Sequence, residues 1–422
     1  MLGSRDRRYA RRLCVALLGL VLASPGCRHR SPAQAIEPAS SSTGAVVELL
    51  VIGQARESAS TRAVARELDR HLQAAATTER SAIVLWLGTD LGPRGPERSG
   101  RCIDPAQVFA SPALAELAAV VTNAVERGAS SWGLPGPDGW RCDPSGLLAD
   151  AAPYRQPGAA YLLRVDERGT ARLASHCTDD HCEIDPRRGP PLVELVALDP
   201  SPWLFRELAD EARTEALLGQ QCSLLEALAE QSDNPHETPR LLISPIPIES
   251  AGARGLGGRK QRTSFRYLPE CVQRAIADGL FVGAIGALER DLQVSIDLSN
   301  AILRGDRSFI ARPLFQLIAG SAGGASHTLP TSRGGSVLPE LWSEHTGFAR
   351  VLIAGTPHAQ AQIHVHARVA GRWREATVTV PLDPEPLGPL RETPTIQPCP
   401  SCDPQAGAPE SRSFTPRGRR RP

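Results

Sequence analysis

The sequence predicts an α/β protein in which a sheet of parallel strands carries a second sheet packed against it. In the first third of the chain, short apolar runs rich in β-branched residues alternate with segments of helical periodicity. This order is typical of parallel strands joined by helices. In the second half, strand-like runs follow one another more closely, which indicates the second sheet. The 422 residues suffice for one large domain or two ordinary ones.

The N-terminal half begins with a strand and continues in strand–helix order. Residues 45–53 form an apolar run that ends at a glycine, as expected of a strand covered on both faces. In residues 60–76, Val64, Leu68 and Leu72 recur at helical spacing. The other elements predicted in this half are a strand at 81–88, a helix at 111–128, strands at 159–166 and 192–199, and a helix at about 204–230.

The rest of the folded region is dominated by strands. The elements predicted there are a strand at 239–244, a helix at 269–279, and strands at 280–286, 292–298, 315–320, 348–355 and 362–369. Folds with parallel strands place their binding and catalytic sites in the loops at the carboxyl ends of those strands. These loops are therefore where the sequence predicts a functional site.

The first 27 residues have the features of an export signal. A charged segment at 5–12 precedes an apolar segment at 13–23, which is far shorter than the ~20 residues of a membrane helix. Small residues then lead to Cys27, so the segment resembles a bacterial lipoprotein signal in which Cys27 carries the lipid. A plain secretory signal cut nearby is the alternative. Arg28 favours the outer over the inner membrane, facing the periplasm or the surface.

Four regions are expected along the chain. They are a signal peptide at 1–27, a flexible polar linker at 28–44, a folded domain at 45–383 and a disordered, Pro-rich basic tail at 384–422. The charge is nearly balanced, with 47 basic and 46 acidic residues. A balanced chain has no strong field to attract nucleic acid or an anionic membrane. The membrane contact that we expect is made through the lipid anchor.

Cysteine usage fits an exported chain. Beyond Cys14 and Cys27, eight cysteines remain, and an even number outside the cytoplasm favours disulfides. Spacing alone leaves the connectivity open. The local pairs that we expect are Cys177–Cys182, across a tight turn, and Cys102–Cys142, between two loop-like segments.

The loops that follow the predicted strands resemble, in series, those of the calcineurin-like metallophosphoesterases. The resemblance spans about 45–383 and is to the purple (tartrate-resistant) acid phosphatase-like branch. It is carried by backbone-shaping residues around each loop, namely Gly53, Gly88, Pro93, Gly95, Pro135, Gly136, Trp140, Pro247, 250–252, Leu292, Gln293 and 322–324. It implies a four-layer α/β/β/α sandwich of two mixed sheets, with a pair of metal ions held where the loops meet.

The side chains at the family's seven metal-ligand places are all substituted. Gln54 and Thr89 stand at the two aspartate places, Gly92 at the tyrosine, Pro137 at the asparagine, Pro245 at the first histidine, and Leu288 and Arg290 at the last two histidines. Alkyl groups have no lone pair for a metal, and neutral oxygens are weak donors. The resemblance therefore implies the fold without its di-metal centre, its cofactor or a catalytic residue.

Two arginines fall at active-site imidazole places and permit another function. Arg254 and Arg290 could bind a phosphate or carboxylate through bidentate contacts. Internal ion pairs with Asp138, Glu249 or Glu289 are the alternative.

Two segments carry potential metal ligands outside these loops. Residues 176–182 (HCTDDHC) combine histidines and cysteines, but a disulfide that closes a hairpin is the favoured interpretation. His364 and His366 lie on one face of a predicted strand with His358 nearby, and a surface strand is favoured there.

The function predicted from these observations is a non-catalytic, lipid-anchored protein of the bacterial envelope that acts by binding or scaffolding, with an unknown protein or an anionic ligand as partner. One alternative is a phosphoester hydrolase with a site rebuilt from Asp90, Asp138, Glu249 and Glu289. Another is an envelope metal-binding protein that uses the histidines of 176–182 or 358–366.

Overall fold

The computed structural model describes the folded part of the chain with several gaps. The described residues are 46–55, 58–78, 80–88, 97–98, 101–102, 109, 111–142, 153–178, 181–186, 189, 191–205, 210–231, 238–250, 265–289, 291–296, 298, 314–322, 341–343, 345–355 and 359–382, without the side chains of 46, 97, 98, 101, 102, 138, 141, 142, 266 and 342. The predicted signal peptide with Cys27, the linker and the basic tail lie outside these ranges. No helix among the described residues is long and apolar enough to cross a membrane.

The first sheet joins the N-terminal strands to the last strands of the fold. Its order among the described residues is β18 (Arg372–Pro381), β17 (Gln360–Val369), β16 (Gly347–Ala354), β1 (Val46–Gly53), β2 (Ala82–Leu87) and β5 (Ser130–Leu134). The strands β1, β2 and β5 are parallel, whereas β16, β17 and β18 pair antiparallel. The sheet is therefore mixed.

The second sheet contains the middle of the chain. Its order in the described part is β15 (Leu341–Ser343), β13 (Leu292–Ser295), β14 (Phe315–Ala319), β12 (Gly283–Gly286), β11 (Arg240–Ile243), β10 (Val193–Leu198), β6 (Ala160–Val165) and β7 (Ala171–Leu173). The four central strands β10, β11, β12 and β14 are parallel, and antiparallel strands flank them. It too is mixed.

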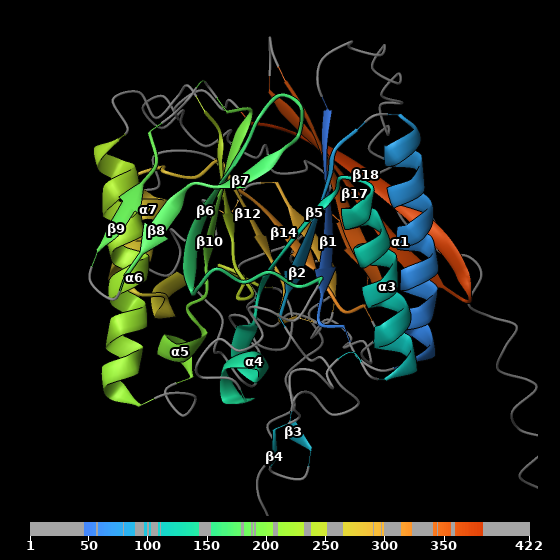
Figure 1. Cartoon of the computed structure of the whole chain (residues 1–422), viewed down its shortest axis with the longest axis horizontal. Helices are drawn as coiled ribbons and strands as arrows, with labels where there is room; N and C mark the ends of the chain where they lie inside the picture. The colour runs from blue at the N-terminus through green and yellow to red at the C-terminus, as the bar shows by residue number, and fades with distance from the viewer. Residues whose placement is uncertain are drawn as a thin grey trace, which may run out of the picture. The chain divides into compact units, whose positions relative to one another are not determined.

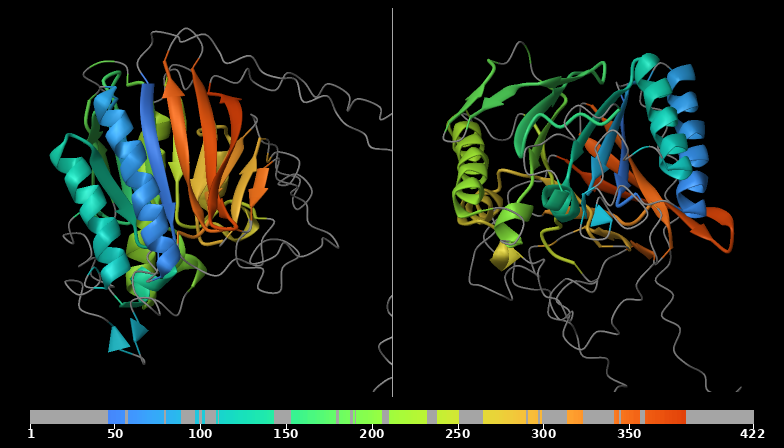
Figure 2. Two further views of the ribbon diagram at one scale, coloured as in Figure 1. Left: turned by 90° about the vertical axis from the view of Figure 1, so that its right-hand side faces the viewer. Right: turned by 60° about the horizontal axis from the view of Figure 1, so that its bottom comes forward.

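The two sheets pack face to face with helices on both outer sides (Figure 1). The largest apolar cluster lies between the sheets and takes residues from both, such as Leu49 and Leu195. Helices α1 (Ala59–Thr77) and α3 (Pro112–Glu126) lie side by side on the first sheet (Figure 2, left). Helices α6 (Glu211–Glu230) and α7 (Glu270–Ala277) cover the second. The four-layer α/β/β/α sandwich of two mixed sheets is thus confirmed.

Smaller elements complete the described structure. They are the helices α4 (Gly136–Cys142) and α5 (Ser201–Leu204), the 3-10 turn at Phe265–Tyr267, and the short hairpins β3 (Glu97–Arg98) with β4 (Arg101–Cys102) and β8 (Ser175–Cys177) with β9 (Cys182–Ile184).

Local sequence explains the helices that cover the first sheet. Ser58 caps α1 by accepting a hydrogen bond from the backbone N–H of Thr61 at 3.1 Å. Val64, Leu68 and Leu72 then face the sheet at intervals of one helical turn and are buried. The periodicity that predicted this helix is therefore the pattern that packs it.

Several predicted elements differ from the structure. The strands predicted at 348–355 and 362–369 return to the first sheet as β16 and β17, and do not join the second. The helix predicted at about 204–230 is two described helices, α5 and α6, because Phe205 leaves helical geometry. The strands β5 and β18 and the helix α4 were not predicted. Loop-forming residues of α4, Gly136 and Pro137, obscured it.

Two disulfides tie described elements together. Cys177–Cys182 closes the β8–β9 hairpin, so the predicted pair is confirmed. Cys222–Cys271 joins α6 to α7, a pair that spacing alone did not predict. The side chains of Cys102 and Cys142 are not described, so that pair stays a prediction.

Candidate functional site

The loops at the carboxyl ends of the strands converge, as expected. We call this region the strand-end edge and define it by the residues that follow β1, β2, β5, β11, β12 and β14. A methyl carbon placed on Gly136 would lie 3.0 Å from Cα of Gly88 and 3.2 Å from Cβ of Pro245. One placed on Gly88 would lie 3.6 Å from Cγ of Gln54. Four loops from both sheets therefore meet at one place.

Close backbone contact between the sheets positions the strand-end edge. A methyl carbon on Gly53, the last residue of β1, would lie 2.1 Å from the carbonyl oxygen of Gly320, which follows β14. The backbone N–H of Ala322 donates to the carbonyl of Gly53 at 3.2 Å. Only glycine permits this approach at position 53, and it sets the separation of the loops on either side.

Four of the predicted ligand places are described, and each is buried within the protein. Gln54 is 3% exposed, and its Oε1 has no hydrogen-bond partner among the described residues. Pro137 and Pro245 are also buried. Leu288 has the left-handed φ of 63°, which is unusual for a leucine. It packs in a small apolar cluster with Trp140, Ala159, Phe205, Leu217 and Ile246.

These side chains do not fit a pair of metal ions. Proline and leucine side chains offer no lone pair, and the amide oxygen of Gln54 is neutral. A di-metal centre of hard and borderline ions needs several carboxylate and imidazole donors at once. Leu288, one of the four predicted places described, instead packs in an apolar cluster with Trp140.

A buried carboxylate missed in the sequence organises the same edge. Asp199 follows β10 and is fully buried. Its Oδ2 accepts hydrogen bonds from the backbone N–H of Gly136 at 2.8 Å and from Nε1 of Trp140 at 2.9 Å, and its Oδ1 accepts from the N–H of Ser201 at 3.0 Å. Burial raises the pKa of Asp199, and the hydrogen bonds from Ser201, Gly136 and Trp140 oppose this rise. Asp199 thus anchors the beginnings of α4 and α5.

The carboxylates proposed for a rebuilt hydrolase are only partly described. Oε1 of Glu249 accepts a hydrogen bond from the backbone N–H of Phe265 at 3.1 Å. This oxygen therefore holds the backbone of the 3-10 turn in place. Glu289 is 1% exposed. The side chain of Asp138 and the whole of Asp90 lie outside the described residues. Their convergence stays a prediction.

The remaining predicted site residues also lie outside the described part of the chain. They are Thr89, Gly92, Arg254 and Arg290, together with the lipid-bearing Cys27 and with His358. The anion site at the two arginines stays a prediction.

The histidines of 176–182 form no metal-binding group with the other described residues. The cysteines of the segment form the disulfide. Nε2 of His176 lies 3.9 Å from a carboxylate oxygen of Asp185, and Nε2 of His181 lies 3.8 Å from one of Glu183. Both imidazole side chains are 69% exposed, so each histidine faces solvent beside an acidic neighbour.

The other histidine pair is not on a surface strand, and that prediction is wrong. His366 is only 3% exposed because α1 covers this face of β17. Its ring centroid lies 4.6 Å from that of His71 on α1 and 4.8 Å from that of Phe348 on β16, against which it stacks. His364 turns toward the next strand, where its Nδ1 lies 2.5 Å from Oε1 of Glu375.

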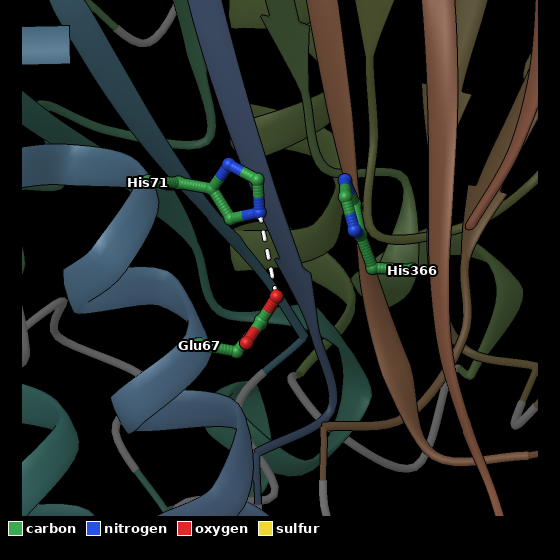
Figure 3. A group of neighbouring side chains, drawn as sticks. All are labelled: Glu67, His71 and His366. Atoms are coloured by element: carbon green, nitrogen blue, oxygen red, sulfur yellow. Dashed lines mark ion pairs between the residues drawn. The ribbon is translucent and has the colours of Figure 1, made fainter. Parts of the chain in front are cut away.

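Glu67, His71 and His366 bring three potential metal-ligand atoms together (Figure 3). We call this group the His71–His366 cluster. One atom from each residue lies within 4.8 Å of the other two, and the described part of the chain holds no other group of this kind. Nε2 of His71 is 3.6 Å from Oε1 of Glu67.

Electrostatics keep both imidazoles of the cluster neutral. Burial lowers the pKa of His71 from 6.5 to about 4, and the guanidinium groups of Arg350 and Arg70 act in the same direction. Burial, with a smaller contribution from His71, also lowers the pKa of His366 to about 4. Near pH 7 each ring therefore retains one lone pair.

The sequence contained only part of the signal for this cluster. Glu67 and His71 are four residues apart in a predicted helix, a spacing that places both on one helical face. His364 and His366 share one face of a predicted strand. The meeting of α1 with β17 depends on the return of the last strands to the first sheet, which the order of elements did not indicate.

Comparisons with known proteins give similarity to solved structures alone. No protein family and no curated protein sequence matches the chain. The purple acid phosphatase PPD1 from yellow lupin (Lupinus luteus) seeds aligns with 82% of this chain at 8% identity and a TM-score of 0.47. The chain covers 55% of that enzyme, or about half its length.

A second solved structure is shorter and aligns almost completely. A single mutant of Vps29 from Entamoeba histolytica aligns over 79% of this chain and 99% of its own, at 11% identity and a TM-score of 0.26. The described strands and helices themselves establish the architecture: this chain is an α/β/β/α sandwich of two mixed sheets, the arrangement that a metallophosphoesterase-like fold requires.

Proposed function

We propose that the chain is a non-catalytic protein of the metallophosphoesterase fold, anchored to the bacterial envelope by lipid on Cys27, that acts by binding or scaffolding. The observation that carries the proposal is the packing of Leu288. This residue stands at a predicted histidine-ligand place and lies in an apolar cluster with Trp140 and Ile246.

The reason is chemical. Phosphoester hydrolysis in this fold depends on metal ions that polarise the phosphate and lower the pKa of a bound water. Without donors at Pro137, Pro245 and Leu288, the edge retains its backbone shape and loses the groups that bind the ions. A shaped surface without catalysis is suited to binding a partner protein or an anionic ligand.

An activity assay tests the non-catalytic proposal. The purified full-length chain is incubated with an aryl phosphate in the presence of iron, zinc or manganese, beside an active purple acid phosphatase as the positive control. We expect no turnover above background. Metal-dependent turnover that disappears in Asp90→Asn or Asp138→Asn would refute the proposal and favour the rebuilt hydrolase.

A processing assay tests the anchor. The wild-type chain expressed in a Gram-negative host is expected to partition into the detergent phase and to carry lipid on Cys27 by mass spectrometry. Cys27→Ala should release the chain or block its processing. A mature N-terminus downstream of Cys27 would show that the signal is an ordinary secretory one.

Titration with inorganic phosphate distinguishes the two kinds of partner. If the edge binds anions through Arg254 and Arg290, phosphate should bind the wild type and not the Arg254→Gln/Arg290→Gln double variant. Absence of phosphate binding in the wild type leaves a partner protein as the ligand, which cross-linking on whole envelopes would then identify.

A further inference from the structure

We propose that Glu67, His71 and His366 form a binding site for one divalent first-row transition-metal ion, and that Zn²⁺ fits their donor set. The site lies between α1 and β17, on the outer face of the first sheet (Figure 3). It is separate from the strand-end edge, and it stands or fails independently of the function proposed above.

Rigid elements place the three donor side chains. Glu67 and His71 are one turn apart on α1, so their side chains project from the same helical face. His366 projects from β17 toward that face, as Figure 3 shows. The neighbouring Phe348 stacks on the ring of His366 and contacts the ring of His71 edge-on, which fixes the planes of both imidazoles.

The hydrogen bonding of the two imidazoles also points to a ligand. The Nε2 atoms of His71 and His366 are both buried and have no hydrogen-bond partner among the described residues. Buried polar atoms are nearly always paired in proteins. The two rings lie 4.6 Å apart between centroids, with the carboxylate of Glu67 beside them. A metal ion would satisfy such a group, since one ion accepts a lone pair from each ligand.

The distances and donor types of the cluster fit zinc. Zinc binds imidazole nitrogen at ~2.0–2.1 Å and carboxylate oxygen at ~2.0–2.2 Å in tetrahedral order, so its ligand atoms lie roughly 3.3–3.6 Å apart. Oε1 of Glu67 is 3.6 Å from Nε2 of His71, and small side-chain rotations bring the third atom, now within 4.8 Å, to the same spacing. Two imidazoles with one carboxylate favour zinc or a similar ion over Mg²⁺ and Ca²⁺, which prefer oxygen ligands.

Neighbouring charges predict how the site responds to mutation. A guanidinium nitrogen of Arg70 contacts Oε1 of Glu67, and the Arg70 side chain is 70% exposed. Arg70 therefore competes with the ion for the carboxylate and can move into solvent. Arg350 is held by Glu48 through contacts of 2.7 and 3.3 Å, so it does not compete for Glu67.

Zinc titration of the purified full-length chain tests the site. The chain is freed of metal with a chelator, kept without reductant so that its disulfides persist, and titrated with Zn²⁺ by calorimetry. We expect Zn²⁺ to bind with high affinity at one site per chain, and we expect no such binding of Ca²⁺. His71→Gln and His366→Gln should each weaken zinc binding about 100-fold or more, since loss of even an outer partner costs ~10–100-fold.

Two further variants separate loss of the site from loss of the fold. Arg70→Gln leaves the core intact and should strengthen zinc binding by up to about fivefold, because it removes a surface competitor of Glu67. The double variant His176→Gln/His181→Gln removes exposed histidines elsewhere and should change the affinity by less than about twofold. Circular dichroism shows whether each variant is folded.

The zinc titrations either support the site or overturn it. Loss of zinc binding in both histidine variants, together with a gain in Arg70→Gln, supports the site. The proposal is overturned if the wild type binds no zinc, if folded His71→Gln and His366→Gln bind it as tightly as the wild type, or if zinc binding disappears only in the His176→Gln/His181→Gln variant.

Discussion

The strand-end edge has the position expected of a site without its donor side chains, whereas the His71–His366 cluster has donor side chains in an unexpected position. The edge lies where strand-end loops from both sheets meet, and a methyl carbon on Gly136 would lie 3.2 Å from Cβ of Pro245. Yet its predicted ligand places that the structure describes hold Gln54, two prolines and a leucine. The cluster has two neutral imidazoles and a carboxylate within 4.8 Å, but it lies under a helix on the outer face of a sheet, where this fold predicts no site.

The difference teaches that position and chemistry are separable. A fold supplies backbone geometry, whereas the side chains at a site decide which reaction or ligand it supports. At the edge, the close approach of Gly53 to Gly320 sets the backbone geometry of the loops. At the cluster the donors meet because α1 happens to cover β17.

The substitution Gly53→Ala should destabilise the protein most, because it disrupts the backbone contact that positions the edge. Gly53→Ala places a methyl group 2.1 Å from the carbonyl oxygen of Gly320, a backbone atom that cannot rotate away. Overpacking of this kind costs about 3 kcal/mol or more of unfolding free energy. Urea denaturation measures it, with Gly189→Ala as the matched control because open space surrounds Gly189. Equal stability of the two variants would contradict the packing described here.

A second substitution introduces one potential metal donor at the edge. Leu288→His puts an imidazole among Trp140, Phe205 and Ile246. Burial of a polar ring without partners, with loss of the leucine, should lower the unfolding free energy by about 2–3 kcal/mol and bring no phosphatase activity. A variant as stable as the wild type that gains metal-dependent turnover would mean that the edge is still close to a working site.

Zinc bound at the cluster should raise the unfolding free energy of the protein by a similar amount. At a free concentration of one hundred times the dissociation constant, a ligand that binds only the folded state adds about 2.7 kcal/mol. Thermal unfolding of the metal-free protein with and without zinc measures this gain. His366→Gln should show none of it, and a gain that persists in that variant would locate the ion elsewhere.

Asp199→Asn tests the anchor of the edge. The carboxylate accepts hydrogen bonds from Gly136, Trp140 and Ser201, and an amide can present an oxygen to only one side. The variant should lose about 2 kcal/mol of unfolding free energy because at least one buried donor is left unpaired. If denaturant titration shows no loss, the carboxylate does not organise α4.

The substitution His71→Leu should change stability least, and it shows whether His71 serves metal binding or the packing of the fold. In the metal-free protein, His71→Leu removes a buried nitrogen without a partner and introduces a better helix former. It should raise the unfolding free energy by about 1 kcal/mol while abolishing zinc stabilisation. A loss of stability without metal would show that His71 serves the fold itself.

Sequence patterns were sufficient for elements whose packing is local. The bounds of β1, β2, α1 and α3 lie within one or two residues of those predicted, because continuous apolar runs and helical periodicity report burial directly. The side-by-side order of β1 and β2 follows from a helical crossover between parallel strands. The disulfide Cys177–Cys182 could be predicted because a tight turn brings its cysteines together.

Non-local pairing was beyond the sequence. β18 begins with the charged and largely exposed segment Arg372–Glu375, and its alternating apolar residues are confined to its end, at Val378 and Val380. The antiparallel pairing of β16 with β1 depends on the whole topology, and with it the burial of His366 beneath α1. The left-handed backbone of Leu288 and the role of Asp199 likewise depend on tertiary contacts that no local pattern encodes.

Anomalous diffraction at the zinc edge from crystals of the zinc-soaked protein would locate bound ions directly. We expect one strong anomalous peak between Glu67, His71 and His366, and none at the strand-end edge beside Gln54, Pro245 and Leu288. A pair of peaks at the edge with no peak at the cluster would show that both the metal site and the non-catalytic edge proposed here are wrong.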